Sequence, residues 1–135
     1  AEMGMLVFGT LHTNSAAKTI DRLIDVFPAD EQPQARLSLA DSLAAIVAQL
    51  LVPRAGGAGR VAVHEILLKT PALPNLIRES SISMLTNLMQ AGRSEGMQLL
   101  DDALLDLVTR KIVTPRDAYM KASDKSRFEP LLEGE

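Results

Sequence analysis

Apolar residues between positions 14 and 28 recur at intervals of three and four, which is the spacing of one face of an amphipathic helix. Asn14 has a short polar side chain that favours a helix N-cap, and Pro28 cannot continue the helix, so both ends are marked. A second helix is predicted after Asp30, which would cap it, with Pro33 in the first turn, where a missing N–H is tolerated. The apolar face of the first helix is expected to contain Ala16, Ile20, Leu23, Ile24 and Phe27.

Other apolar stretches have the pattern of strands. Met5–Thr10 is a run without polar alternation, which predicts a strand covered on both faces at the centre of a sheet. Residues 46–52 fit either the end of the preceding helix or a buried strand that stops at Pro53, and we interpret them as a strand. Glycines from Gly56 to Gly59 then separate them from the Val- and Leu-rich stretch 60–68, which predicts a β-hairpin.

Glycine and proline separate the rest of the chain into a series of helices. Starts are predicted at Thr70–Pro71, at Ser81 and at Thr114, where Thr114 and Asp117 resemble a capping box, and Gly92 ends the second of these helices. The clearest amphipathic pattern lies between them, with apolar positions Met97, Leu100, Ala103, Leu104, Leu107 and Val108. A final short helix before the acidic tail is expected to be anchored by Phe128, Leu131 and Leu132.

Composition narrows the class of protein. A chain of 135 residues, 47% apolar and 23% charged, suits one globular unit with a real core. The net charge of −3 and the scarcity of aromatic residues argue against nucleic-acid binding. The chain has no cysteine, which excludes disulfides, iron–sulfur clusters, thiolate zinc sites and cysteine nucleophiles. Apolar stretches such as Leu43 to Ala48 fall far short of the ~20 residues that a bilayer requires, so we expect no membrane insertion.

Two histidines are candidates for chemistry. His12 directly follows the first predicted strand and precedes a capped helix, so it is expected at the carboxyl end of that strand, where ligands of open α/β sheets gather. With the hydroxyls of Thr10 and Thr13, its imidazole could donate a hydrogen bond to a phosphate. Position alone leaves open a loop histidine that bonds only to backbone. His64 precedes Glu65, but Leu68 stands where a zinc motif needs its second imidazole, so we expect a hydrogen-bonded residue of the sheet.

Two catalytic motifs are absent from the sequence. There is no Gly-x4-Gly-Lys-Ser/Thr loop, whose backbone N–H groups would surround phosphates, and no Gly-x-Ser-x-Gly elbow of a serine hydrolase. The glycine-rich stretch Gly56–Gly59 leads into a predicted strand, so it presents no helix N-terminus to an anion. We therefore expect no nucleotide hydrolysis by these residues alone.

Several segments together resemble one family, the secretion-type ATPases that drive type IV pili, and most closely the retraction motors of twitching motility. Leu6–Asn14, with Glu2 and Gly4 before them, resemble the family's His box and its preceding strand. The match continues at Asp21, Arg22, Ile24, Asp25, Phe27 and Pro28. Further matching positions are Gly59, Arg60, Val61, Glu65, Ile66 and Leu67 in the hairpin, and Gly96, Met97, Gln98, Leu100 and Asp101 after it. A helix that is a signature of retraction motors is matched by Ala72, Asn75, Leu76, Ile77, Arg78 and Glu79.

The resemblance implies an α/β fold, the carboxyl-terminal part of a RecA-like ATPase domain, with one buried strand and a β-hairpin followed by helices. Residues 1–69 would complete the ATPase core, and residues 70–135 would form a helical carboxyl-terminal subdomain. The family's amino-terminal domain, phosphate-binding loop, catalytic Glu and magnesium-binding segment are expected before Ala1, so we interpret the chain as a fragment.

The resemblance also implies roles and partners. His12 would sense or position the γ-phosphate of ATP, supported by Thr10 and Thr13, and the whole protein would use ATP and magnesium, neither of which this fragment alone is expected to bind. The whole protein is expected to form a hexameric ring that drives pilus retraction through an inner-membrane platform protein, in the cytoplasm and peripheral to that membrane.

Two alternatives stay open. An assembly or type II secretion ATPase shares the His box but usually carries a tetracysteine zinc module after the segment that matches Gln49 to Leu51, and this chain has no cysteine. The chain could instead be a non-catalytic interaction module of such a motor.

Overall fold

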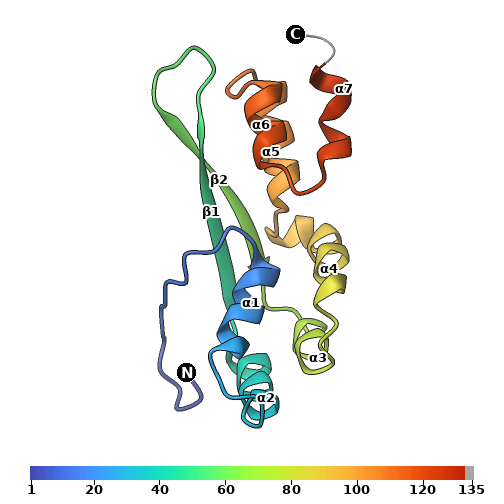
Figure 1. Ribbon diagram of the computed structural model, residues 1–135. Helices are drawn as coiled ribbons and strands as arrows, with labels where there is room; N and C mark the ends of the chain where they lie inside the picture. The colour runs from blue at the N-terminus through green and yellow to red at the C-terminus, as the bar shows by residue number, and fades with distance from the viewer. Residues whose placement is uncertain (133–135) are drawn as a thin grey trace.

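The computed structural model describes residues 1–132 of the chain, so the acidic tail after the last predicted helix lies outside the described residues. A β-hairpin runs through the molecule, and the helices lie along it (Figure 1). In chain order the elements are α1 Ala16–Asp25, α2 Gln32–Ser42, β1 Ala45–Pro53, β2 Arg60–Leu68, α3 Leu73–Arg78, η1 Ile82–Met84, α4 Leu85–Ala91, η2 Gly92–Glu95, α5 Leu100–Thr109, α6 Pro115–Lys121, η3 Lys125–Arg127 and α7 Glu129–Leu132, where η marks short 3-10 helices.

The hairpin confirms the prediction from the sequence. β1 and β2 pair antiparallel along their whole length, with Gln49 opposite His64 near the middle. Residues 54–59 make the turn, and Gly56, Gly57 and Gly59 all have positive φ, a conformation that glycine adopts without steric cost. Across residues 1–132 these are the two strands of the sheet.

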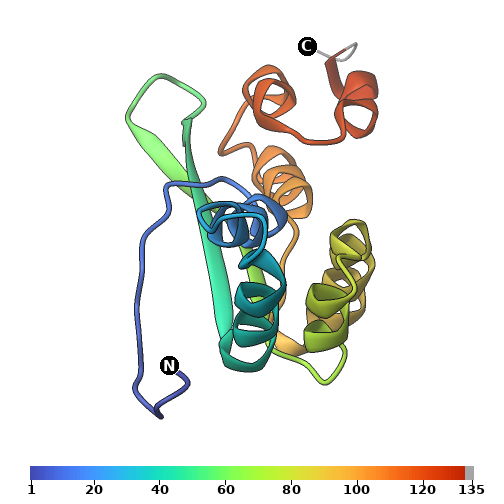
Figure 2. The same cartoon turned by 60° about the horizontal axis from the view of Figure 1, so that its bottom comes forward.

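The strand predicted at Met5–Thr10 is wrong for this structure. These residues form no regular element, and their side chains are exposed, Leu6 at 81% and Phe8 at 88%. A central strand needs hydrogen-bonding partners on both sides, and within residues 1–132 β1 and β2 pair with each other while neither pairs with this segment. In Figure 2 the N-terminal segment runs as an extended trace beside the hairpin before it turns towards α1. The apolar pattern indicates that the segment can be buried. It does not show whether neighbouring strands are present to pair with it.

Three predicted helix starts are also corrected. Ser15 rather than Asn14 caps α1, because its hydroxyl accepts a hydrogen bond from the N–H of Lys18 at 3.2 Å. Glu31 rather than Asp30 precedes α2, and its side chain makes no capping bond. α5 begins at Leu100, since the residue pair Ile66 and Gln98 forms a β-bridge that keeps the preceding segment extended. The Thr114 cap of α6 is confirmed, with its hydroxyl accepting from the N–H of Asp117 at 3.1 Å.

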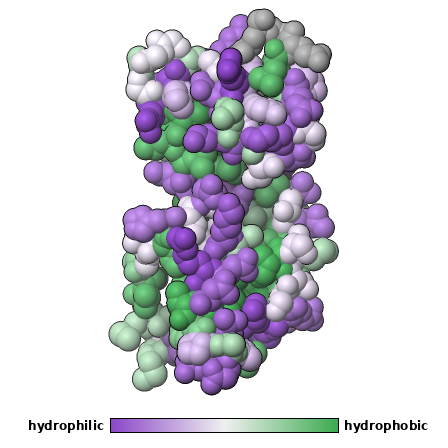
Figure 3. All heavy atoms as spheres, viewed as in Figure 1, coloured by the Kyte–Doolittle hydropathy of each residue, from purple (hydrophilic) through white to green (hydrophobic). Residues whose placement is uncertain are grey.

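Buried side chains gather in two clusters along the hairpin. The first packs α1 to α4 against one half of the hairpin and includes the fully buried Ile20, Leu67 and Ile77. The second packs α5, α6 and the segment around Phe128 against the other half. Both clusters use hairpin residues, and a domain boundary after Lys69 stays a prediction. Polar residues cover much of the face in Figure 3, with apolar surface left at the lower left, where the N-terminal segment lies.

Candidate functional site

His12 lies in the loop that leads into α1, with an exposed side chain and a backbone φ of 53°. Histidine is among the residues enriched in this left-handed conformation, and Ser80 and Lys111 also adopt it here. The loop, α1 and one residue of β1 enclose an open pocket of about 810 Å³. Its lining residues are His12, Thr13, Asn14, Lys18, Asp21, Arg22, Asp25, Val26 and Gln49.

Side chains of α1 hold this loop in place. The hydroxyls of Thr13 and Thr19 are hydrogen-bonded to each other, and Thr19 is buried at the inner face of the helix. Arg22 donates from Nη1 to the carbonyl oxygen of Leu11 at 2.7 Å. Both residues that flank His12 are therefore tied to α1, and the imidazole between them remains accessible.

The pocket has donors that suit one phosphate group. The imidazole of His12, the amide of Asn14 and the ammonium of Lys18 can all donate, and Lys18 Nζ already lies 3.4 Å from Asn14 Oδ1. The carboxylates of Asp21 and Asp25 line the same pocket and repel anions. These groups can donate hydrogen bonds to one phosphate group, and the sequence contains no glycine-rich loop that would bind further phosphates.

The structure brings only part of the predicted site together. His12 and Thr13 share the pocket, whereas Thr10 is exposed and does not line it. His64 lies in β2 with Nε2 at 2.9 Å from Oε1 of Gln49, which confirms the expectation of a hydrogen-bonded residue in the sheet. Sequence reasoning did not single out Lys18, which lines the pocket. Lys18 is six residues after His12 in the sequence, and once α1 forms it lies beside the loop that contains His12.

The helix matched to the retraction signature is α3, between its flanking residues Ala72 and Glu79. It packs on α2, with Ile77 fully buried and Leu76 partly buried, and Arg36 donates to the Ile77 carbonyl at 3.5 Å. Arg78 forms an ion pair with Asp41 and also bonds to Oδ1 of Asn75 at 3.2 Å. None of these residues lines the His12 pocket, so the structure places the signature helix at a separate surface.

Glu65 of β2 is a second residue that the sequence did not single out. Its Oε1 accepts a hydrogen bond from the N–H of Ala16 at 2.8 Å, and its Oε2 accepts from the N–H of Leu100 at 3.2 Å. These are the first residues of α1 and α5. The sequence did contain a sign of this contact. Leu99 precedes α5 and has no polar side-chain group to cap it, so the capping group had to come from another part of the chain.

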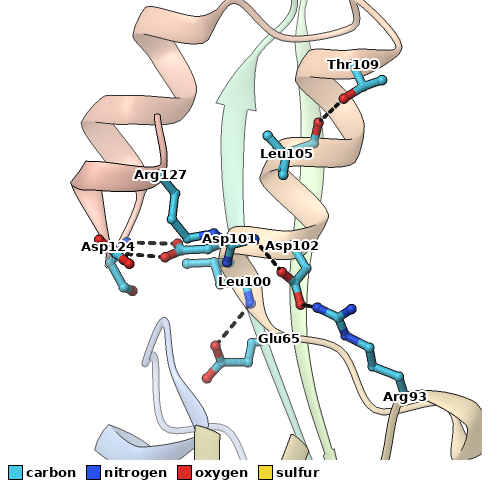
Figure 4. Close-up of polar contacts among 10 residues, drawn as sticks. Glu65, Arg93, Leu100, Asp101, Asp102, Leu105, Thr109, Asp124 and Arg127 are labelled. Carbon is cyan, nitrogen blue, oxygen red and sulfur yellow. Dashed lines mark hydrogen bonds and ion pairs between the residues drawn. The ribbon is translucent and has the colours of Figure 1, made fainter. Parts of the chain in front are cut away.

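Two neighbouring carboxylates of α5 bind residues of η2 before it and of the segment 123–127 after it (Figure 4). Buried Asp101 accepts from the N–H groups of Ser123 at 2.8 Å and Asp124 at 2.7 Å. Asp102 forms ion pairs with Arg127 and Arg93. Burial alone would raise the pKa of Asp102, but the hydrogen bonds and charges of the two arginines outweigh it and hold that pKa below its ordinary value of 3.8.

Within residues 1–132, no three of the His, Asp and Glu side chains lie close enough to hold a metal ion together. A search of the same residues finds no helix with the length and hydropathy needed to cross a bilayer.

Comparison with known proteins relates this chain to a secretion-system family and to proteins of type IV pili. The family described as "Type II/IV secretion system protein" matches residues 1–119. A "Type IV pilus retractation ATPase PilT" of Pseudomonas aeruginosa is 49% identical over 128 residues, 95% of this chain and 37% of the relative. A "Twitching motility protein" of Neisseria gonorrhoeae is 48% identical over 124 residues, 92% of this chain and 33% of the relative. The chain therefore spans about a third of the length of these relatives.

A solved structure agrees with the relatives. The structure titled "Crystal Structure of the Pilus Retraction Motor PilT and Bound ADP" superposes with a TM-score of 0.83 at 39% identity, over 96% of this chain and 36% of that one. The expected fold class, an α/β chain with a hairpin followed by helices, is confirmed and corresponds to the carboxyl-terminal part of that motor.

Proposed function

Because this chain belongs to the type II/IV secretion system protein family, we propose that it serves as the carboxyl-terminal part of an ATPase motor that powers type IV pilus retraction. The observation that carries the proposal is the alignment with a pilus retraction ATPase over 95% of the chain at 49% identity. That relative is a type IV pilus retraction ATPase, and the open pocket of this chain beside His12 contains hydrogen-bond donors for a phosphate group.

His12 is the group proposed to act on the nucleotide. Its imidazole would donate a hydrogen bond to the γ-phosphate, with Thr13 supporting the loop and Lys18 adding positive charge, whereas Thr10 lies outside the pocket. Bound ATP with magnesium would supply the phosphoryl group whose transfer to water releases energy. The phosphate-binding loop and the catalytic Glu would come from other parts of the motor, because the sequence of this chain contains no such loop. His12 then holds the terminal phosphate where negative charge develops.

The remaining surfaces would serve assembly and force transfer. A hexameric ring would bring this chain beside its neighbours, and α3 with Arg78 and Glu79 would act in retraction away from the nucleotide. The motor would contact an inner-membrane platform protein from the cytoplasmic side, with no insertion into the membrane and no nucleic-acid partner.

Two alternatives have observations in their favour. A pilus assembly or type II secretion ATPase shares the His box, but the tetracysteine module usual in that branch requires cysteines, of which this sequence has none. For the chain taken by itself, a non-catalytic interaction module is favoured by the missing phosphate-binding loop.

A segment exchange tests the proposal. The aligned segment of the Pseudomonas aeruginosa relative is replaced by this chain. The resulting chimera is expressed in a Pseudomonas aeruginosa strain from which the gene for the relative has been deleted. We expect rings that hydrolyse ATP and restore twitching across a surface. The unmodified relative is the positive control. A chimera that forms rings and hydrolyses ATP but restores no twitching would contradict a retraction role and favour the assembly alternative.

A further inference from the structure

Glu65 is bonded to two helices that belong to different parts of the core. Ala16, the first residue of α1, lies in the first buried cluster, and Leu100, the first residue of α5, lies in the second. The backbone N–H of each donates to a different oxygen of the same carboxylate, at 2.8 and 3.2 Å (Figure 4 shows the bond to Leu100). One side chain of β2 therefore connects the two clusters through hydrogen bonds.

The chemistry of helix ends explains why a carboxylate suits this position. The first N–H groups of a helix have no partner within it, and the helix dipole places partial positive charge there. α1 and α5 each have ten residues, so both dipoles are well developed. Within residues 1–132, no lysine, arginine or histidine forms an ion pair with Glu65. The two helix N-termini are thus the groups that balance its charge in this part of the chain.

A chain of short contacts leads from Glu65 to the pocket. Glu65 fixes the start of α1, Thr19 of α1 bonds to Thr13, and Arg22 of α1 bonds to the Leu11 carbonyl. His12 lies between these two anchored residues. The start of α5 is held to β2 as well, because Gln98 exchanges backbone hydrogen bonds with Ile66 at 2.8 and 3.0 Å.

We infer that Glu65 is a positioning residue that couples the His12 loop to α5, so that the phosphate pocket and the carboxyl-terminal helices keep one fixed arrangement. The inference deepens the proposed function. The link between Glu65 and the two helices does not depend on that function, whereas the effect on nucleotide through His12 rests on it. Glutamine at this position would keep the shape but has a single acceptor oxygen, so it can satisfy one of the two N–H groups at most.

The bridge is tested on the 135-residue chain by hydrogen exchange of single amides, followed by NMR. In Glu65→Gln we expect at least one of the amides of Ala16 and Leu100 to exchange about tenfold faster or more, since the uncharged side chain accepts from one of them at most. Asp101→Asn is the matched control, because Asp101 also accepts two backbone bonds but both come from residues 123 and 124. It should accelerate those amides and leave Ala16 unchanged.

A second variant keeps the test valid if Glu65→Gln unfolds. Glu65→Asp retains the charge on a side chain one methylene shorter, so it should keep one of the two bonds and accelerate exchange at one of the two amides. Unchanged exchange at Ala16 and Leu100 in a folded Glu65→Gln, or in Glu65→Asp where only that variant folds, overturns the bridge.

The link to His12 is tested in the chimeric ring by a double-mutant cycle on ATP turnover. If Glu65 acts through His12, Glu65→Gln lowers kcat in the presence of His12 and has little further effect in a His12→Ala ring. Losses that simply add overturn the coupling, because a general loss of stability would act in both backgrounds. If His12→Ala itself leaves kcat unchanged, the proposed role of His12 fails, while the exchange result still decides whether Glu65 bridges the two helices.

Discussion

The hydroxyl groups of Thr13 and Thr19 are hydrogen-bonded to each other, which joins the loop that carries His12 to the buried face of α1. Thr19 also donates to the carbonyl of Ser15 at 2.8 Å. The same short stretch of chain therefore caps the helix and holds the candidate phosphate-binding residue.

Thr19→Val should show how much the hydrogen bond between Thr13 and Thr19 contributes to stability. Valine has the shape of threonine without the hydroxyl, so Thr13 loses its partner and the loop loses an anchor. We expect a loss of about 1 kcal/mol in the free energy of unfolding, measured by urea denaturation. Thr109→Val on α5 is the control, since its hydroxyl also bonds to a backbone carbonyl but is exposed. An equal effect in both variants would contradict the importance of the buried pair.

Leu104→Ala should be strongly destabilising. Leu104 is fully buried in the second cluster, so the substitution removes packed methyl groups and leaves a cavity. The expected cost is about 2–5 kcal/mol in the free energy of unfolding. Asp106→Ala on the exposed side of the same helix should cost about 0.5 kcal/mol or less, because its ion pair with Arg110 is a surface pair. A small effect at Leu104 would overturn the assignment of the buried face of α5.

Asp102→Asn should reduce stability at neutral pH but not in strong acid. The two arginines lower the pKa of Asp102 in the folded chain, so the unfolded chain binds the proton more readily. The stabilisation is complete above the ordinary carboxyl value of 3.8 and is lost as the pH falls through the lowered folded pKa. We expect the variant to be less stable by on the order of 1 kcal/mol at pH 7, a difference that shrinks below pH 3.8. A difference that stays constant down to strong acid would contradict the assigned ion pairs.

The isolated chain should bind ATP only weakly. Its pocket has donors for one phosphate and two carboxylates that oppose an anion, and its sequence has no phosphate-binding loop. Titration calorimetry with ATP and magnesium is expected to give a Kd no tighter than about 1 mM, equivalent to about −4 kcal/mol, with no turnover. Saturable binding in the micromolar range would show that the chain carries a more complete nucleotide site than we propose.

Much of the fold follows from local patterns in the sequence. The hairpin was predictable because Gly56–Gly59 separate two Val- and Leu-rich stretches, and the Thr114 cap because its partner is three residues away. The conformation of Met5–Thr10 was not predictable, since a run of apolar residues forms a strand only if another strand pairs with it. The choice between Asn14 and Ser15 as a cap was not visible in the sequence, because both residue types favour the N-cap position.

The candidate site was predictable only in part. His12 and Thr13 were predicted from their place at the carboxyl end of a strand at Met5–Thr10, which the structure does not contain, so their position in one pocket does not confirm that reasoning. The role of Glu65 depends on contacts with residues 49 and 35 positions away, so it appears only when β2 brings α1 and α5 together. The sequence near α5 indicates such a long-range hydrogen bond only indirectly, because the residue before α5, Leu99, cannot cap the helix.

The most direct test of the proposed function is the ATP turnover number of the chimeric ring carrying His12→Ala, compared with the ring carrying His64→Ala. His12 lines the pocket, whereas His64 lies in β2 and does not line it, so the pair separates the nucleotide site from the fold. We predict that kcat falls by about 10²-fold or more in His12→Ala, with thermal stability nearly unchanged, and stays close to the parent value in His64→Ala. An unchanged turnover number in His12→Ala, or an equal loss in both variants, would contradict the proposal.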